Sequence, residues 1–179
     1  MANLSTKIAI SNSLENLLKH KHFSAITVKD IVQDCGLTRT TFYRHFIDIN
    51  DLVSWIYRYN VDKIIKEYDI NHWTANVEAI SLFIYSKKDF LRAVCEYYGQ
   101  NSFMSFLYDY SIEYLVGMLN KEGVAIDEEL SNAIRFYVNG AVYTDYLWII
   151  NNFKETPSQI TKIICDNVPH SLQKYFCLN

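Results

Sequence analysis

The chain has 179 residues, of which 50% are apolar and 21% are charged, so it can bury a real core and is not a disordered protein. Only 5 glycines and 2 prolines are present, too few for the many turns of an all-β chain, so helices joined by short loops are expected. No apolar run is long enough to span a bilayer and no secretory signal is found, which predicts a cytoplasmic protein with no membrane partner. The 4 cysteines form no Cys-x-x-Cys pair, so neither a zinc site nor a disulfide framework is expected.

Charge is unevenly distributed along the chain. Residues 1–66 hold nine Lys and Arg against six Asp and Glu, a balance of +3. Residues 67–179 hold eight against fourteen, a balance of −6, so the two parts together give the net charge of −3. Because the acidic C-terminal part repels a polyanion, any contact with nucleic acid is expected in the N-terminal segment alone.

Helical periodicity predicts an all-α fold of about nine helices. A first helix is expected over residues 5–20. Thr27 is the expected N-cap of a short second helix, which Gly36 ends, and Thr38 begins a third.

A fourth helix is expected over residues 51–68, with Asp48 or Asn50 as its cap. Its apolar positions shift by about half a revolution partway along, so its two halves pack on different cores. We therefore expect an N-terminal domain over residues 1–50 and a C-terminal helical domain over 51–179, with the boundary inside this helix.

Five further helices are predicted over residues 74–85, 88–98, 102–121, 128–152 and 157–176. Gly99 and Gly123 are expected stops, Thr156 and Gln159 have the capping-box spacing, and Pro169 is placed to kink the last helix. The helix over 128–152 is apolar on two sides, the second side being formed by Phe136, Gly140, Tyr143, Leu147 and Ile150. A second copy of the chain is the simplest partner for that side, which predicts a homodimer.

The segment from Thr27 to Phe46 has the pattern of a helix-turn-helix, which offers its second helix to the major groove of double-stranded DNA. Phe42 and Phe46 are four residues apart and are expected to be buried anchors. An ordinary amphipathic helical hairpin explains these apolar positions equally well. Such a hairpin does not require the polar residues that cluster within eight consecutive positions: Thr38, Arg39, Thr40, Thr41, Tyr43 and His45.

The first helix, this segment and the run IDINDLV together resemble the DNA-binding domain of the tetracycline-repressor (TetR/AcrR) family. The positions that match the family pattern are Thr27, Gly36, Leu37, Thr38, Arg39, Phe42, Tyr43, His45, Phe46, Asp51 and Leu52. One departure is Ile49, where the family usually has a lysine near phosphate. The loss of this contact is expected to weaken DNA affinity without changing specificity.

The resemblance implies a bacterial transcription regulator that binds its operator as a homodimer. Arg39, Thr40 and Thr41 would reach base edges. The residues implied to hold phosphates are Thr27, Thr38, Tyr43 and His45. Arg44 and Lys29 are either further backbone contacts or solvated, and His45 is alternatively a packed structural histidine. Two copies would place their recognition helices roughly 34 to 36 Å apart and select a near-palindromic operator.

The run LVSWIY, Leu52 to Tyr57, resembles the branch of that family related to the regulator of the dihydroxyacetone kinase operon. That resemblance implies an activator that works with a protein co-regulator. Alternatively, Trp55 and Ile56 in this run are ordinary core residues of the fourth helix.

The C-terminal helices are rich in aromatic residues, which either line an effector pocket or form ordinary core. The candidate ligand-binding residues are Tyr97, Tyr98, Phe106, Asp109, Tyr110, Tyr137 and Asp145. For Asp109 and Asp145, which lie among aromatics, the alternative is simple solvent exposure. The effector is either a small molecule or a protein co-regulator.

No catalytic motif is present: the chain has no Gly-rich phosphate loop, no H-E-x-x-H and no Gly-x-Ser-x-Gly, and its 5 histidines are dispersed. We therefore expect no enzyme, no catalytic residues, no cofactor and no bound metal. The remaining alternative to a DNA-reading regulator is a helical protein-interaction module that keeps the fold and works through a protein partner.

Overall fold

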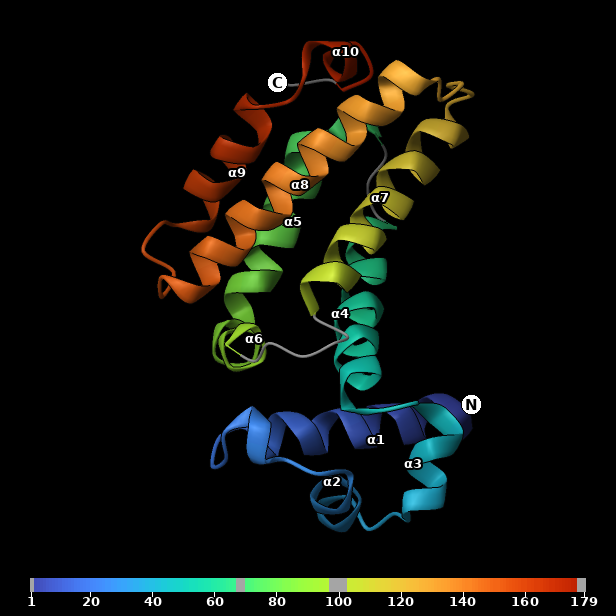
Figure 1. Cartoon of the computed structure of the whole chain (residues 1–179), viewed down its shortest axis with the longest axis vertical. Helices are drawn as coiled ribbons and strands as arrows, with labels where there is room; N and C mark the ends of the chain where they lie inside the picture. The colour runs from blue at the N-terminus through green and yellow to red at the C-terminus, as the bar shows by residue number, and fades with distance from the viewer. Residues whose placement is uncertain (1, 67–69, 97–102, 177–179) are drawn as a thin grey trace.

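The structure is a computed structural model, and it describes residues 2–66, 70–96 and 103–176. All regular structure within these residues is helical, with ten α-helices and two short 3-10 helices (Figure 1). This confirms the predicted all-α fold class. None of the described helices is long and apolar enough to cross a membrane.

Three N-terminal helices pack around one small core: α1 (Ala2–Leu17), α2 (Val28–Asp34) and α3 (Arg39–His45). Fully buried side chains from each of them meet there, including Leu14, Ile31 and Phe42. The helix predicted over 5–20 begins and ends three residues earlier. After Leu17 the chain makes a turn, in which the Leu17 carbonyl accepts the backbone N–H groups of His20 at 3.0 Å and of Lys21 at 2.9 Å.

The long helix α4 (Ile49–Ile65) rises from this N-terminal unit into the larger helical body (Figure 1). Asp48 is its N-cap and accepts the backbone N–H of Asp51 at 2.8 Å, which decides between the two predicted caps. The helix packs against α1 near its start and against α5 and α7 further along. One helix therefore contacts both groups of helices, as its shifting apolar face predicted.

The body consists of α5 (Trp73–Ser86), α6 (Lys88–Cys95), α7 (Phe103–Lys121), α8 (Glu128–Ile150), α9 (Pro157–Asp166) and α10 (His170–Gln173). The longest of these, α8, packs against α6, α7, α9 and α10, while α5 packs on α9. In Figure 1, α6 lies at the end of the body that faces α1.

The ends of the body helices follow local sequence rules. Thr156 and Gln159 form the predicted capping box, with bonds of 2.8 and 3.3 Å between side chain and backbone. Gly123 has a φ of +73°, a left-handed conformation that glycine adopts without strain after α7. The single helix predicted over 157–176 is wrong: Pro169 lacks an N–H and becomes the N-cap of a separate α10. The expected stop at Gly99 lies outside the described residues.

Candidate nucleic-acid interface

The turn between α2 and α3 is built by local hydrogen bonds. The Thr27 hydroxyl accepts the backbone N–H of Asp30 at 3.2 Å, and the Asp30 carboxylate accepts the N–H of Thr27 at 2.9 Å, a complete capping box. Gly36 then takes a φ of +66°, which a side chain would strain. Thr38 caps α3 by accepting the N–H of Thr41 at 3.1 Å. The predicted positions of both caps and of the glycine turn are confirmed.

The inner face of α3 is held by aromatic packing. Phe42 is fully buried, and its ring centroid lies 5.7 Å from that of Phe46. Phe46 in turn packs edge-on against Trp55 of α4 at 5.8 Å. The ammonium group of Lys7 lies 5.2 Å from the Phe46 ring and 5.4 Å from the Trp55 ring, which ties α1 to the same cluster. The orientation of α3 is thus fixed by both α1 and α4.

The outer face of α3 is polar and exposed. Tyr43 is 58% exposed, a high value for a large aromatic side chain next to a buried anchor. Six of the eight residues predicted to contact DNA are exposed: Thr27, Thr38, Arg39, Thr40, Tyr43 and Arg44. Thr41 and His45 are half-buried. Thr41 shares a 2.9 Å hydrogen bond with the Thr38 hydroxyl, and the His45 ring lies 6.5 Å from Phe46.

Asp30 is an acidic group next to Thr27, and a lysine neutralises it. Asp30 accepts the Lys21 ammonium at 2.9 Å and the Thr27 hydroxyl at 2.7 Å. These hydrogen bonds from Lys21 and Thr27 hold the pKa of Asp30 well below its usual range. Because Asp30 keeps a paired cation, it does not leave an isolated negative charge facing a phosphate backbone. Lys29, also on α2, is exposed.

Two isoleucines flank the start of α4. Ile49 is half-buried and packs against the hydrophobic core, so it supplies neither the charge nor the reach of the lysine that the family usually carries there. Ile47 is 82% exposed, and its backbone N–H donates to Asp51 at 2.9 Å. Sequence reasoning did not single out Ile47, because an apolar residue next to two anchors fits the amphipathic pattern of a buried position.

The predicted ligand-binding residues of the body do not form one cluster. Phe106 and Tyr110 stack at 5.7 Å, and the Tyr110 hydroxyl donates to Asp62 at 2.7 Å. Tyr137 accepts from the Trp73 indole at 3.1 Å and donates to the Ile164 carbonyl at 3.2 Å, so it is well satisfied as core.

The two acidic candidates differ in their surroundings. Asp109 is exposed on α7, which was the simpler alternative for it. Asp145 on α8 instead has a buried carboxyl oxygen. Tyr97 and Tyr98 lie outside the described residues.

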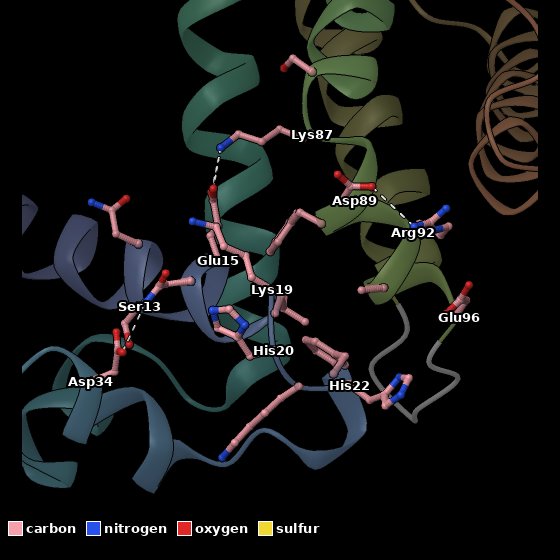
Figure 2. A pocket seen from close by; sticks show the side chains of 18 of the residues that line it. Ser13, Glu15, Lys19, His20, His22, Asp34, Lys87, Asp89, Arg92 and Glu96 are labelled. Atoms are coloured by element: carbon pink, nitrogen blue, oxygen red, sulfur yellow. Dashed lines mark hydrogen bonds and ion pairs between the residues drawn. The ribbon is translucent and has the colours of Figure 1, made fainter.

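An open cleft of about 1550 Å³ lies between the N-terminal unit and the body. It is lined from one side by α1 and the loop after it, including His20 and His22, and from the other by the start of α6. Figure 2 shows Lys87, at the corner between α5 and α6, reaching across to Glu15 of α1. Sequence reasoning did not find this pair, because the two residues are far apart in the chain and each is an ordinary surface charge by itself.

These features define a class: a helix-turn-helix unit with an exposed cationic second helix, joined by one long helix to a separate helical body. Comparison with known protein families agrees. Residues 12–54 match the family described as "Bacterial regulatory proteins, tetR family", and residues 71–169 match the one described as "Transcriptional regulator C-terminal region". The chain therefore belongs to the TetR family, and it is a transcriptional regulator and not an enzyme.

Individual relatives support the branch that the run LVSWIY indicated. The HTH-type dhaKLM operon transcriptional activator DhaS of Lactococcus lactis subsp. lactis (strain IL1403) is 29% identical over 62 residues, which is 35% of this chain. The match spans about a third of that relative's length, 33%.

Two solved structures share the fold. The dihydroxyacetone kinase operon activator DhaS superposes with a TM-score of 0.65 at 19% identity, over 91% of this chain and 96% of that one. A TetR transcriptional regulator from Streptococcus agalactiae superposes with a TM-score of 0.66 at 20% identity, over 94% of this chain and 96% of that one. At these identities the superpositions establish the fold alone.

Proposed function

We propose that this regulator reads a specific operator through the outer face of α3. The observation that carries the proposal is that Arg39, Thr40 and Tyr43 are exposed on a short helix whose opposite face is locked by buried Phe42. Arg39 and the threonines at the start of α3 read base edges, with the arginine able to bond guanine in bidentate fashion. The hydroxyl and imidazole groups set the register on phosphates: Thr27, Thr38, Tyr43 and His45. Because bacterial DNA lies in the cytoplasm, the regulator acts there.

The regulator works as a homodimer through α8. Phe136 is 80% exposed and Tyr143 is 58% exposed, and both lie on the stripe that continues through Leu147 and Ile150. A Cβ added at Gly140, in the middle of this stripe, would meet nothing within 4 Å, so another helix can approach closely there. A second copy covers this stripe and brings two recognition helices to a near-palindromic operator.

The unit that binds DNA and the body that senses a ligand or partner meet within α4, which is where we place the domain boundary. A ligand or partner that prefers one packing of the body shifts α4 and, through Lys87 and Glu15, α1. Operator affinity then changes only as far as the effector binds the two states differently.

A second candidate is activation through a protein partner in place of a small molecule. The name of the DhaS relative, an operon activator, favours activation over repression. Transcription by purified polymerase from the chain's own upstream region separates the modes. A fall on adding the chain alone supports repression, and a rise supports activation.

The DNA-reading proposal is tested by titrating the full chain against DNA from its own upstream region and a scrambled control at two salt concentrations. Arg39→Ala is expected to reduce the preference for the upstream DNA, because one base contact in each half-site is lost. Lys154→Ala is the matched control, because it removes one exposed positive charge that lies after α8 and outside the helix-turn-helix. Equal weak binding to both DNAs by the unaltered chain would overturn the proposal.

A further inference from the structure

A smaller open cleft, of about 350 Å³, lies between α4 and α7 in the body. These two helices pack side by side (Figure 1). The lining comes from their C-terminal halves, from Arg58 to Lys66 and from Tyr110 to Lys121. A Cβ added at Gly117, in this part of α7, would meet nothing within 4 Å, so the cleft is open in front of that residue. Its volume is in the range of small-molecule sites, about 300 to 1000 Å³.

The apolar part of the lining is formed by Ile65, Tyr110, Tyr114 and Met118. Two of these side chains are held from behind by Asn76, a fully buried residue of α5. The Asn76 amide donates to the Tyr114 hydroxyl, and it lies 3.9 Å from the Met118 sulfur. Because these contacts exist without a ligand, this wall of the cleft is already in place and little freedom is lost when a ligand packs on it.

Both carboxylates in the lining already have partners. The Arg58 guanidinium donates to Glu113 at 2.9 Å, and the Tyr110 hydroxyl donates to Asp62 at 2.7 Å. Each of these bonds joins α4 to α7. The acidic groups therefore serve to hold the two helices together, and neither leaves an uncompensated negative charge in the cleft.

The other charged groups of the lining are two lysines. Lys66 is the C-cap of α4 and Lys121 is the last residue of α7, and both residues are exposed. Neither forms an ion pair or a hydrogen bond through its ammonium group with any other residue that the structure describes. Together with Arg58, the lysines give the lining three cations against two carboxylates, a net charge of +1. The charge that the fold leaves unpaired in this cleft is positive.

Two unpaired ammonium groups beside an apolar wall favour an organic anion, which supplies the acceptors that the fold does not. An organic cation would be repelled by Lys66 and Lys121. A phosphate dianion is a poor match, because the cleft lies at the C-terminal ends of two helices, which carry a partial negative charge and offer no free N–H groups. We propose that this cleft is the effector site of the regulator and binds a small organic carboxylate with an apolar body.

The regulatory role of the cleft rests on the proposed function. A carboxylate that competes with Glu113 for Arg58 would remove one of the bonds that join α4 to α7. The start of α4 packs against α1 of the DNA-binding unit. A change in how α4 sits against α7 is therefore carried directly to that unit.

The test is calorimetric titration of the full chain, near pH 7.5, with 3-phenylpropionate and with 3-phenylpropionamide, which have nearly the same shape and differ in charge. The unaltered chain is expected to bind the carboxylate about tenfold more tightly than the amide. The double variant Lys66→Met with Lys121→Met keeps apolar stems and is expected to bind both probes equally. Lys63→Met with Lys154→Met is the matched control, because it removes two exposed lysines outside the lining and should keep the preference.

A second variant tests the place of the site by shape alone. Gly117→Leu puts a side chain into the open space of the cleft and is expected to weaken the binding of both probes at least about tenfold. Circular dichroism and urea titration check that each variant is folded. Because leucine is a better helix former than glycine, this substitution is not expected to destabilise α7.

Four outcomes would overturn the site: no preference for the carboxylate in the unaltered chain, a preference that survives loss of both lysines, unchanged binding by Gly117→Leu, or no binding of either probe at about 10 mM. The DNA titration is run separately without a probe. If DNA binding fails while the charge preference holds, the regulatory function falls and the site stands. The reverse result removes the site alone.

Discussion

The Lys87 ammonium group donates to both carboxylate oxygens of Glu15, at 2.9 and 2.7 Å, and so joins the corner between α5 and α6 to α1. The two side chains are 30% and 27% exposed. An ion pair that water reaches contributes less than about 1 kcal/mol to stability. Its main consequence is geometric, because it fixes how the DNA-binding unit sits against the body.

Replacing Lys87 by methionine should therefore change the orientation of the DNA-binding unit with little change in the stability of the chain. The free energy of unfolding in a urea titration is expected to change by less than about 1 kcal/mol. Operator affinity is expected to fall by roughly three- to tenfold, because the DNA-binding units lose one constraint on their orientation. The exchanged pair Glu15→Lys with Lys87→Glu should restore affinity. Lys88→Met, next in the chain, should leave it unchanged, and equal losses for Lys87→Met and Lys88→Met would contradict this role.

Thr38 has two predicted roles, to cap α3 and to contact a phosphate, and two substitutions at this position separate them. Thr38→Ala removes the cap on α3 and should lower the free energy of unfolding by about 1 kcal/mol. Thr38→Asp keeps a capping oxygen but places a negative charge where a phosphate is expected, so stability should hold while DNA affinity falls at least about tenfold. Denaturant titration and DNA titration of both variants measure the two effects. DNA binding by Thr38→Asp as tight as that of the unaltered chain would show that this position does not face phosphate.

The exposed stripe of α8 predicts the effect of Phe136→Glu. Each copy would lose the burial of one phenylalanine, about 2 kcal/mol or more, and the loss occurs twice in a symmetric pair. Sedimentation analysis should show a monomer at concentrations where the unaltered chain is a dimer. Leu4→Glu, which alters an exposed leucine on α1, is the control and should remain dimeric. A dimer that persists in Phe136→Glu would place the interface elsewhere.

Asp145 predicts a pH dependence of stability. Burial raises its pKa to about 7 in the folded chain, against 3.8 for an unperturbed aspartate. Between these values the folded state binds more protons than the unfolded state, so this group makes stability fall as pH rises. Asp145→Asn should remove that fall, and its stability advantage should grow by about 2 kcal/mol between pH 5 and pH 8.

Urea titrations of Asp145→Asn and of the unaltered chain at the two pH values measure this difference. Cys95 does not contribute to the difference between pH 5 and pH 8, because the pKa of this thiol is raised to about 12. An advantage that stays constant with pH would show that Asp145 is ionised and solvated like an ordinary surface carboxylate.

The sequence predicted what depends on neighbours three or four residues apart. The caps at Thr27, Thr38 and Thr156 each bond the N–H three residues on, so the pattern contains its own partner. The anchors of α3 follow from the same periodicity.

Contacts between distant parts of the chain were not predictable in this way. Glu15 and Lys87 become partners only when α5 turns into α6 above α1. The sequence left open whether Asp145 is buried, because burial depends on how the neighbouring helices, α6 and α7 among them, pack on α8. Ile47 is apolar and would be expected in the core, but it lies in the turn after α3 and is exposed.

The most direct test of DNA reading is selection of binding sites from a random pool of duplex DNA by the full chain and by Arg39→Ala. If two copies of α3 read the major groove, the unaltered chain will enrich a near-palindromic sequence with half-sites roughly 10 base pairs apart, centre to centre. Arg39→Ala should lose the preference for one base, a guanine, in each half-site. Recovery of no common sequence, or of the same sequence by both proteins, would contradict the account.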